Sequence, residues 1–321
     1  MESVEAVARA RTFRAHPMTP GRSIALGMFG ASLGVLMTVA AYAQSDDPAA
    51  DELKTTLVGG VVSQIEAVGG FGGGNVAVSI GPDGVLLVDT MTKGIAPKLK
   101  AELARLSTRP VRLVVNTHFH LDHAGGNVGF GESATIVAQE NVRNRLAAAR
   151  MPPAGLPTVT YADGPITLHF NGENIRLMHC SAAHTDGDTI VVFENSKVVH
   201  LGDLYFSGMF PAVYREGGGD WKGLIACLDR VMPNLPEDAA VIAGHGPSSH
   251  MRELRAYVAM LKETTSIVES HLRAGETATQ MNAANVLVKY DALGSGGAQS
   301  TSQYVEMLVK LLSPPRDERS K

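Results

Sequence analysis

Short apolar or alternating segments predict β-strands along most of the chain before Met251. These segments are residues 56–70, 75–90, 111–118, 134–139, 167–180, 189–203 and 240–246. The segment 75–90 contains a hairpin turn, the Gly-Pro-Asp-Gly sequence at 81–84. The glycine-rich segment Gly69–Asn75 predicts a flexible loop that joins two strands of a hairpin.

Apolar residues at helical spacing predict helices between these strands, at 95–106, 140–150 and 221–232. From Met251 onward the chain is expected to be mostly helical, up to the charged tail 314–321. Two strand-rich halves that each contribute helices indicate two sheets packed on each other, with helices on the outer faces. No change in composition marks a second domain, so we expect one α/β domain over residues 56–321.

The N-terminal region has the pattern of a secretory signal. Arg22 precedes an apolar stretch, Ile24–Ala40, and Ala41 and Ala43 form a small-x-small cleavage pattern. A transmembrane anchor is the less favoured interpretation, because the apolar core is short and no basic residue directly follows it. We predict a cleaved signal peptide over 1–43, with Met18 as an alternative start, and a linker over 44–55. Export would place the mature protein in the periplasm, without a stable membrane anchor.

Composition narrows the choice of partners and of redox state. The net charge of −4 and the pI near 6.3 provide no basic field for nucleic acid, so a small-molecule substrate is expected. The oligomeric state stays open. The chain has 2 cysteines, Cys180 on a predicted strand and Cys227 within a predicted helix. They can pair, but we interpret them as separate buried structural thiols.

The segment Asn116–Asn127, with the sequence NTHFHLDHAGGN, has the residue types of a metal site. Alternate residues of a strand share a face, so the first two histidines point the same way, and a turn after the strand brings the next ligands back. Imidazole nitrogens and carboxylate oxygens are ligands that zinc prefers. A solvent-facing polar loop would explain a lone His-x-His, but not this density of ligands: His118, His120, Asp122 and His123.

Three more ligand-type residues lie at the ends of other predicted strands. His184 follows the strand that ends at Cys180, Asp203 ends an apolar run, and His245 lies between two glycines after a third strand. Loops at strand ends commonly carry functional residues on a rigid sheet. We therefore expect these residues to complete the metal site.

The motifs HFHLDH, AHTDGD, HLGDLYF and GHGP resemble those of the metallo-β-lactamase superfamily, in the order of that family, from about Val58 to at least Pro247. The resemblance implies a four-layer αββα sandwich and a hydrolase with two Zn²⁺ ions per chain. It assigns His118, His120 and His184 to one zinc site. It assigns Asp122, His123 and His245 to the second zinc site, with Asp203 bridging both ions or serving the second alone.

The same resemblance implies a mechanism. A hydroxide held between the two ions attacks a carbonyl, because metal binding lowers the pKa of water to roughly 7. Asp122 orients this nucleophile and shuttles a proton to the leaving group.

The remaining histidines and acidic residues receive structural interpretations. His200 is expected to be packed or to support a ligand, and Asp186 and Asp188 to hold the loop after His184. The other histidines are expected to be structural or on the surface: His169, His179, His250 and His271. Arg215 and Lys222 are candidate contacts for a substrate carboxylate, although solvated loop residues are the favoured interpretation.

The ligand set resembles that of thioesterases, lactonases and phosphodiesterases of the superfamily. It departs from the β-lactamases that have cysteine at the position of Asp203, and from those that have only histidine ligands. The predicted export and the glycine-rich hairpin nevertheless favour opening of β-lactam rings, with lactone or thioester hydrolysis as the alternative and phosphodiester hydrolysis behind them. An iron-loaded redox protein is less favoured, because such relatives usually carry glutamate at the position of His120. A non-catalytic metal-binding protein is disfavoured because every expected ligand is present.

Overall fold

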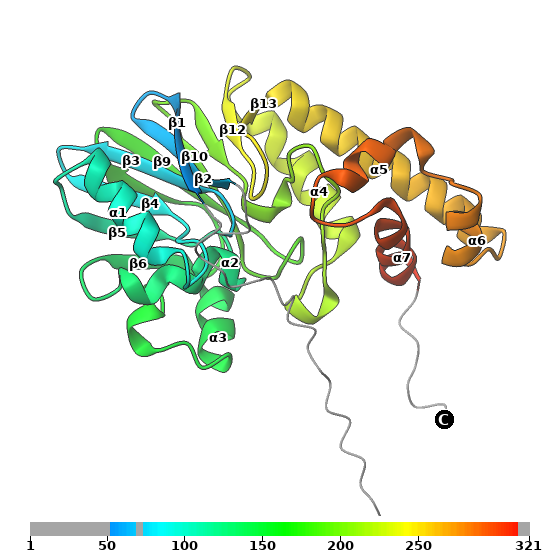
Figure 1. Ribbon diagram of the computed structural model, residues 1–321, viewed down its shortest axis with the longest axis horizontal. Helices are drawn as coiled ribbons and strands as arrows, with labels where there is room; N and C mark the ends of the chain where they lie inside the picture. The colour runs from blue at the N-terminus through cyan, green and yellow to red at the C-terminus, as the bar shows by residue number, and fades with distance from the viewer. Residues whose placement is uncertain (1–51, 69–72, 314–321) are drawn as a thin grey trace, which may run out of the picture. The chain divides into compact units, whose positions relative to one another are not determined.

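Two β-sheets form the centre of the fold (Figure 1). The structure, a computed structural model, describes residues 52–68 and 73–313, all within one compact unit. The first sheet has seven strands in chain order: β1 (Glu52–Gly59), β2 (Val62–Val68), β3 (Val76–Gly81), β4 (Gly84–Val88), β5 (Val111–Val115), β6 (Thr135–Gln139) and β7 (Val159–Tyr161). Strands β1 to β4 pair antiparallel. From β4 to β7 the pairing is parallel, because helical connections return the chain to the same edge.

The second sheet has six strands in the order β13-β12-β11-β10-β9-β8. Their bounds are β8 (Ile166–Phe170), β9 (Glu173–Cys180), β10 (Asp188–Phe193), β11 (Val198–His200), β12 (Ala240–Ile242) and β13 (Ser249–His250). All neighbours pair antiparallel except β11 and β12, which are parallel. The helix α4 (Trp221–Val231) lies between these two strands in the chain.

Alternation along the strands separates an inner core from outer cores. In β4, Leu86 and Val88 belong to the cluster between the sheets, which also contains Leu177 and Val191 of the second sheet. Val85 and Leu87 of the same strand point to the opposite face, where they share a cluster with Leu99 of α1 (Ala96–Leu106). This period of two is expected when both faces of a strand are buried.

Helices cover the outer faces of both sheets (Figure 1). The outer face of the first sheet packs against α1 and α3 (Glu140–Ala148). The outer face of the second sheet packs against α4, α5 (Met251–Arg273) and α7 (Thr301–Leu312). The remaining helical elements are α2 (Leu121–Ala124), α6 (Ala278–Ala283), η1 (Gly125–Gly129), η2 (Pro153–Gly155), η3 (Gly202–Leu204), η4 (Arg215–Gly217), η5 (Met232–Asn234) and η6 (Val288–Ser295). The predicted four-layer αββα sandwich is therefore confirmed.

Besides the segment 56–70, which forms parts of β1 and β2 around a turn at residues 60 and 61, two predicted strand segments, 167–180 and 189–203, each contain a turn. The first folds as the hairpin β8–β9 around Asn171 and Gly172, which both have positive φ. Two consecutive residues with positive φ suit the tight turns that match the twist of antiparallel strands. In the second segment, β10 and β11 pair across the turn 194–197.

Cys180 at the end of β9 and Cys227 in α4 form a disulfide, with Cα atoms 5.8 Å apart. Our interpretation of the two cysteines as separate thiols is therefore wrong. Helix α4 packs on the outer face of the second sheet and brings Cys227 to the end of β9. Spacing in the sequence cannot show this proximity, because it arises from tertiary packing.

The predicted signal peptide, residues 1–43, lies outside the described residues. The linker predicted over 44–55 is wrong at its C-terminal end, because β1 begins at Glu52 and pairs with β2 from that residue. None of the described helices has the length and apolar composition needed to cross a membrane.

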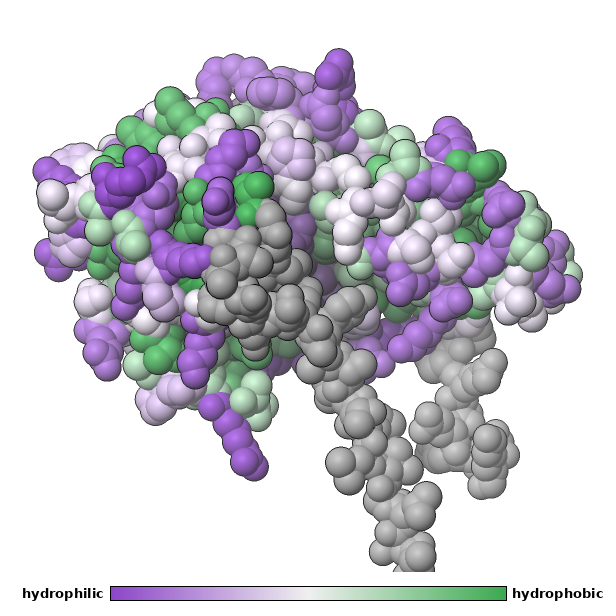
Figure 2. Space-filling model, viewed as in Figure 1, coloured by the Kyte–Doolittle hydropathy of each residue, from purple (hydrophilic) through white to green (hydrophobic). Residues whose placement is uncertain are grey.

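The displayed face of the molecule mixes hydrophilic and hydrophobic residues (Figure 2). The most exposed large apolar side chains belong to separate elements, with Leu57 on β1, Val288 on η6 and Leu121 on α2. Isolated apolar residues of this kind are ordinary on a protein surface.

Candidate metal centre

The structure brings all seven predicted ligands together. They form two groups, and in each group the ligand atoms lie within 4.8 Å of one another. The first group is His118, His120, His184 and Asp203, and the second is Asp122, His123, Asp203 and His245. Asp203 belongs to both.

The ligands come from the ends of strands in both sheets. The first sheet supplies His118, just after β5, and then His120, Asp122 and His123 at the start of α2 and within it. The second sheet supplies His184 after β9, Asp203 after β11 and His245 after β12. Because strands β9 to β12 are neighbours in this sheet, their connecting loops lie at adjacent positions.

In the first group the imidazole nitrogens converge on one point. His120 Nδ1 lies 3.1 Å from His118 Nε2 and 2.9 Å from His184 Nε2. Asp203 Oδ2 is 3.4 Å from His184 Nε2 and 3.8 Å from His118 Nε2. Separations of this size suit four ligands that each lie about 2 Å from a shared tetrahedral ion.

The second group uses the other oxygen of Asp203. Asp203 Oδ1 lies 3.0 Å from His123 Nε2 and 3.5 Å from His245 Nε2. Asp122 Oδ2 is 3.3 Å from His245 Nε2. Among the described residues, no hydrogen-bond partner satisfies the buried Asp203 Oδ1. A buried, unsatisfied carboxylate oxygen facing two imidazoles fits a site for a cation.

The three buried histidines of the centre each have a partner for the other ring nitrogen. His184 Nδ1 donates to the Ala212 carbonyl at 2.7 Å, and His123 Nδ1 lies 2.8 Å from Asp89 Oδ2. His118 Nδ1 lies 3.0 Å from Thr117 Oγ1, which in turn donates to Asp89. Such partners fix the tautomer and leave the opposite nitrogen for a metal.

Asp89 and Thr117 were not singled out from the sequence. The signal that points to Asp89 is a carboxylate directly after the fully buried strand β4, because such a position requires a buried partner. Thr117 Oγ1 and its backbone N–H both donate to Asp89.

The glycine-rich loop ends against the second group. Gly74 N donates to the Asp122 carbonyl, and a Cβ at Gly74 would overlap the His123 ring. Asn75 donates from its side chain to the carbonyls of Ala243 and Gly246, on either side of the His245 turn. The loop was predicted to be flexible, but Gly73–Asn75 packs against the candidate ligands, while 69–72 lie outside the described residues.

The electrostatics of the second group also favour a cation. Burial opposes protonation of His123, but the carboxylates of Asp203, Asp122 and Asp89 outweigh it and raise its pKa well above the usual value. Burial likewise lowers the pKa of His245, but Asp203 and Asp122 overcome this effect and raise it to about 9. In the first group, burial and then the neighbouring His184 lower the pKa of His120 to about 3. The second group therefore attracts positive charge, and the first presents neutral imidazoles.

His200 and Asp188 support the loops that carry candidate ligands. His200 accepts from Gly202 N and donates to the Asn75 carbonyl, so it supports the turn that carries Asp203. Asp188 accepts from Thr185 N and Oγ1 and holds the loop after His184, as predicted.

The remaining residues of this set contact other parts of the chain. Asp186 pairs with both ends of the Arg145 guanidinium, His179 lies 3.1 Å from the Asp186 carbonyl oxygen, and His250 is the N-cap residue of α5. His169 and His271 contact Asn174 and Glu276.

The interpretation of Arg215 and Lys222 as solvated loop residues is only partly correct, because Lys222 is exposed but lies in a helix, and Arg215 is partly buried. Arg215 Nη2 donates to the carbonyls of Leu311 and Ser313 at the end of α7. Lys222 lies in α4 and pairs with Glu269 of α5 at 2.9 Å. Both cations are engaged with the C-terminal helices instead of with the metal centre.

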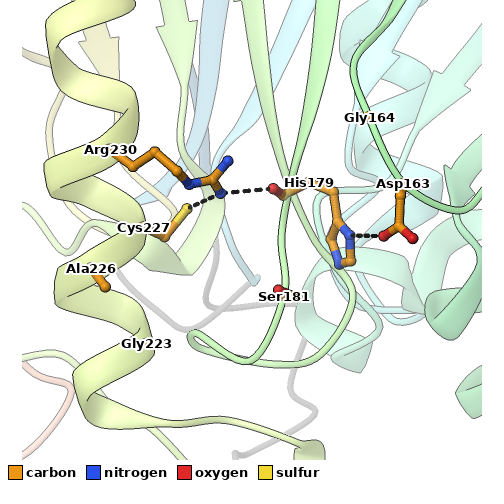
Figure 3. A pocket seen from close by; sticks show the side chains of 8 residues that line it. All are labelled: Asp163, Gly164, His179, Ser181, Gly223, Ala226, Cys227 and Arg230. Carbon is orange, nitrogen blue, oxygen red and sulfur yellow. Dashed lines mark hydrogen bonds and ion pairs between the residues drawn. The ribbon is translucent and has the colours of Figure 1, made fainter.

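A separate surface pocket of about 400 Å³ lies between α4 and the segment that includes Asp163 and Gly164 (Figure 3). Its lining includes His179, Cys227 and Arg230, and Arg230 donates to the His179 carbonyl. The seven candidate ligands are not among its lining residues. The pocket is therefore distinct from the metal centre.

Comparisons with known proteins agree with this geometry. The family model described as the metallo-beta-lactamase superfamily matches residues 69–245. The chain is 28% identical over 198 residues to the alpha subunit of a 2,4-dinitroanisole O-demethylase from Nocardioides sp. (strain JS1661), covering 61% of this chain and 59% of that protein. It is 26% identical over 154 residues to the hydroxyacylglutathione hydrolase GloC of Haemophilus influenzae (strain ATCC 51907 / DSM 11121 / KW20 / Rd), covering 42% of this chain and 69% of that protein.

Among solved structures, a metallo-beta-lactamase from Pontibacter korlensis has a TM-score of 0.58 at 20% identity. The match covers 66% of this chain and 99% of that one, and it supports the fold. The chain spans about three fifths of the length of the demethylase subunit. The family match extends over more than half of this chain and includes all seven candidate ligands. The chain therefore belongs to the metallo-beta-lactamase superfamily, a family of metal-dependent hydrolases.

Proposed function

We propose that the protein hydrolyses ester-type carbonyl bonds, in lactones or thioesters, with two Zn²⁺ ions held by the seven residues of the centre. The observation that carries this proposal is the Asp203 carboxylate, which turns one oxygen to each group. A carboxylate shared in this way suits two ions held side by side. The hydroxyacylglutathione hydrolase among the relatives supports a carbonyl substrate of this class.

The seven residues of the centre would hold two different ions. His118, His120 and His184 would hold one ion, Asp122, His123 and His245 the other, and Asp203 both. When bound, such ions lower the pKa of water and polarise a carbonyl oxygen. His120, Asp122 and His245 are partly exposed, whereas His118, His123, His184 and Asp203 are buried, so substrate approaches from the side of the three partly exposed ligands.

Asp122 is the residue placed to move a proton. Burial raises its pKa, but the charges of His123 and His245 outweigh burial and lower it to about 2. Its carboxylate is therefore ionised at neutral pH. It can accept a proton from the attacking water and deliver it to the leaving atom.

Opening of β-lactam rings is the second candidate. The contact of Gly74 with Asp122 favours it, because it places Gly73–Asn75, the described end of the glycine-rich segment, beside the centre. Against it, Arg215 and Lys222, the two cations considered for a substrate carboxylate, both contact other elements. Without such a cation the carboxylate of a penicillin or cephalosporin loses a charge-assisted bond.

A substrate panel tests the proposal. The protein is assayed with a lactone, a thioester, a chromogenic cephalosporin and a phosphodiester, beside the double variant His118→Ala/His120→Ala. We expect turnover of the lactone or the thioester that a chelator abolishes and zinc restores. Turnover of the cephalosporin alone would favour the second candidate. Carbonyl substrates that react no faster than with the double variant would refute hydrolysis of carbonyl bonds.

Metal analysis separates zinc from iron. We expect two equivalents of zinc and no visible redox bands in the purified protein. Stoichiometric iron with redox-active spectra would overturn the zinc assignment.

We also propose that the protein is exported to the periplasm and that residues 1–43 are removed. The charged, apolar and small-residue pattern of this segment supports cleavage. The Cys180–Cys227 disulfide supports export, because disulfides persist in oxidising compartments. Fractionation of expressing cells and N-terminal sequencing test this proposal. A protein that stays in the cytoplasm and still carries residues 1–43 would contradict it.

A further inference from the structure

We infer that Gln299 and Met307, which precede α7 and lie within it, are positioning residues for His184. The inference rests on the proposal that His184 is a metal ligand. It extends the functional centre to a helix well beyond the segment 69–245 that matches the family model.

The first link runs from His184 to the segment Phe210–Gly217, here called the support segment. His184 Nδ1 donates to the Ala212 carbonyl at 2.7 Å. This bond fixes the ring so that Nε2 faces His120 Nδ1 and Asp203 Oδ2. A shift or rotation of the Ala212 carbonyl would therefore turn the imidazole away from the other ligands.

The second link holds both neighbours of Ala212. Gln299 Nε2 donates to the Pro211 carbonyl, and Val213 N donates to Met307 Sδ at 3.3 Å. Gln299 Nε2 also lies 3.6 Å from Met307 Sδ, so the two side chains contact each other. The residues on either side of Ala212 are thus hydrogen-bonded to this part of the chain.

Further contacts make the support segment and α7 one packed unit. Phe210 and Tyr304 are both fully buried and their rings stack with centroids 4.1 Å apart. Arg215 Nη2 donates to the Leu311 carbonyl at 2.7 Å and to the Ser313 carbonyl at 3.0 Å. Lys310 pairs with Glu216 at 3.2 Å on the exposed side. Coupling through contiguous packing of this kind is how a distant helix can set the position of a ligand.

The other end of the support segment borders the first group. A Cβ at Gly217 would lie 3.3 Å from the Phe119 ring and 3.9 Å from His120 Nε2. Asp186 N donates to the Gly217 carbonyl, which ties this turn to the loop after His184. The segment therefore contacts the surroundings of two of the three histidines in the first group.

The test compares a double variant, Gln299→Leu/Met307→Leu, with the control Lys310→Ala. Both substitutions to leucine keep a similar side-chain volume, so the helix can still pack. Lys310→Ala also removes a contact between α7 and the support segment, but one that does not involve Pro211 to Val213. The metal-free proteins are titrated with Co²⁺ and with Zn²⁺, and their thermal unfolding is recorded.

We expect the parent to bind two ions and the double variant to bind one of them about tenfold more weakly, the lower end of the range for residues that orient ligands. The visible spectrum of its cobalt form should change, whereas Lys310→Ala should match the parent. If the double variant does not fold, Met307→Leu alone replaces it. This variant should weaken binding of the same ion by a several-fold smaller factor.

Unchanged affinity for both ions in a folded variant would overturn the inference. A parent that binds no ion would instead refute the proposed metal centre, so the two failures are distinguishable. In a His184→Ala background the two leucine substitutions should no longer change affinity for the remaining ion. A persistent change there would show that they act elsewhere and would also overturn the inference.

Discussion

At the residue scale, the metal centre depends on one carboxylate with two oxygens in use. Asp203 Oδ1 faces His123 and His245, and Oδ2 faces His118 and His184. A shorter side chain with a single ligand atom would not present one separate atom to each group.

We predict that Asp203→Cys keeps one zinc ion and loses the second. A thiolate is a good zinc ligand, with a bond of about 2.3 Å, but its one sulfur lies on one side of the centre. Metal content after dialysis and the hydrolysis rate measure the effect, and activity should fall by about 100-fold or more. Retention of two ions would show that binding of both ions does not require the two oxygens of Asp203.

Gly74 provides a second test at this scale. Its place beside His123 leaves no room for a methyl group, so Gly74→Ala should displace the ring and weaken the second group. We expect loss of one zinc equivalent and a fall in kcat, measured beside Gly94→Ala. Gly94 has no atom within 4 Å of the position of a Cβ, so that variant should behave as the parent. Equal zinc content in the two variants would contradict the role of Gly74.

The order and types of residues along the chain predicted the candidate ligands, but not the residues that hydrogen-bond to them and hold them in place. The local density of histidine and aspartate in 116–127 indicated a metal site by itself. Asp89, Thr117 and Asn75 could not be recognised in the same way, because single polar residues acquire their roles from partners far along the chain. Arg215 and Lys222 illustrate the same limit, since only the folded C-terminal helices reveal what they contact.

At the element scale, the disulfide joins the end of β9 to α4 and closes a loop with a sequence separation of 47 residues. The segment that it anchors leads directly to His184. It contains Ala182, whose φ of 49° is unusual for a residue with a side chain. Asp220 N, at the start of α4, donates to the Ala183 carbonyl in the same segment.

We predict that Cys180→Ala/Cys227→Ala lowers the free energy of unfolding by about 4 kcal/mol, the amount expected for a loop of this length. Alanine suits both sites because Cys180 and Cys227 are buried. Urea denaturation with the metal-free protein measures the change without any contribution from bound ions. A loss below about 1 kcal/mol would show that the disulfide adds little to stability.

Periodicity predicted where strands and helices occur and much less of their pairing. The faces of β4 follow from the structure, in which Leu86 and Val88 pack toward the other sheet and Leu87 toward α1. The turn within 189–203 and the start of β1 at Glu52 were missed, because short polar turns interrupt an apolar pattern only weakly. The Cys180–Cys227 pair was missed for a different reason: it depends on the packing of α4.

At the scale of the whole molecule, the ions would join the two sheets. Four candidate ligands follow β5 of the first sheet, and three follow strands of the second. Bound metal would therefore stabilise the folded sandwich in addition to its role in hydrolysis, because it binds the folded state and not the separated strands.

We predict that removal of metal by a chelator lowers the unfolding temperature and that zinc restores it. When the free metal concentration is a thousand times the dissociation constant of a site, binding adds about 4 kcal/mol to the free energy of unfolding. Differential scanning calorimetry with and without the chelator measures the shift. The variant His123→Ala/His245→Ala should respond less, and an equal response would mean that the second group binds no ion.

The distribution of ligands along the chain also sets the order in which the centre can form. His123 and His245 are 122 positions apart, yet their Nε2 atoms lie 3.3 Å from each other. During synthesis, a chain that extends only through β7 contains the four candidate ligands of residues 118–123. It lacks His184, Asp203 and His245, which complete the two groups. Contacts between such distant segments form late, because closing a long loop costs entropy before any contact repays it. A newly made chain thus passes through a stage in which four of the seven candidate ligands are present and neither group is complete.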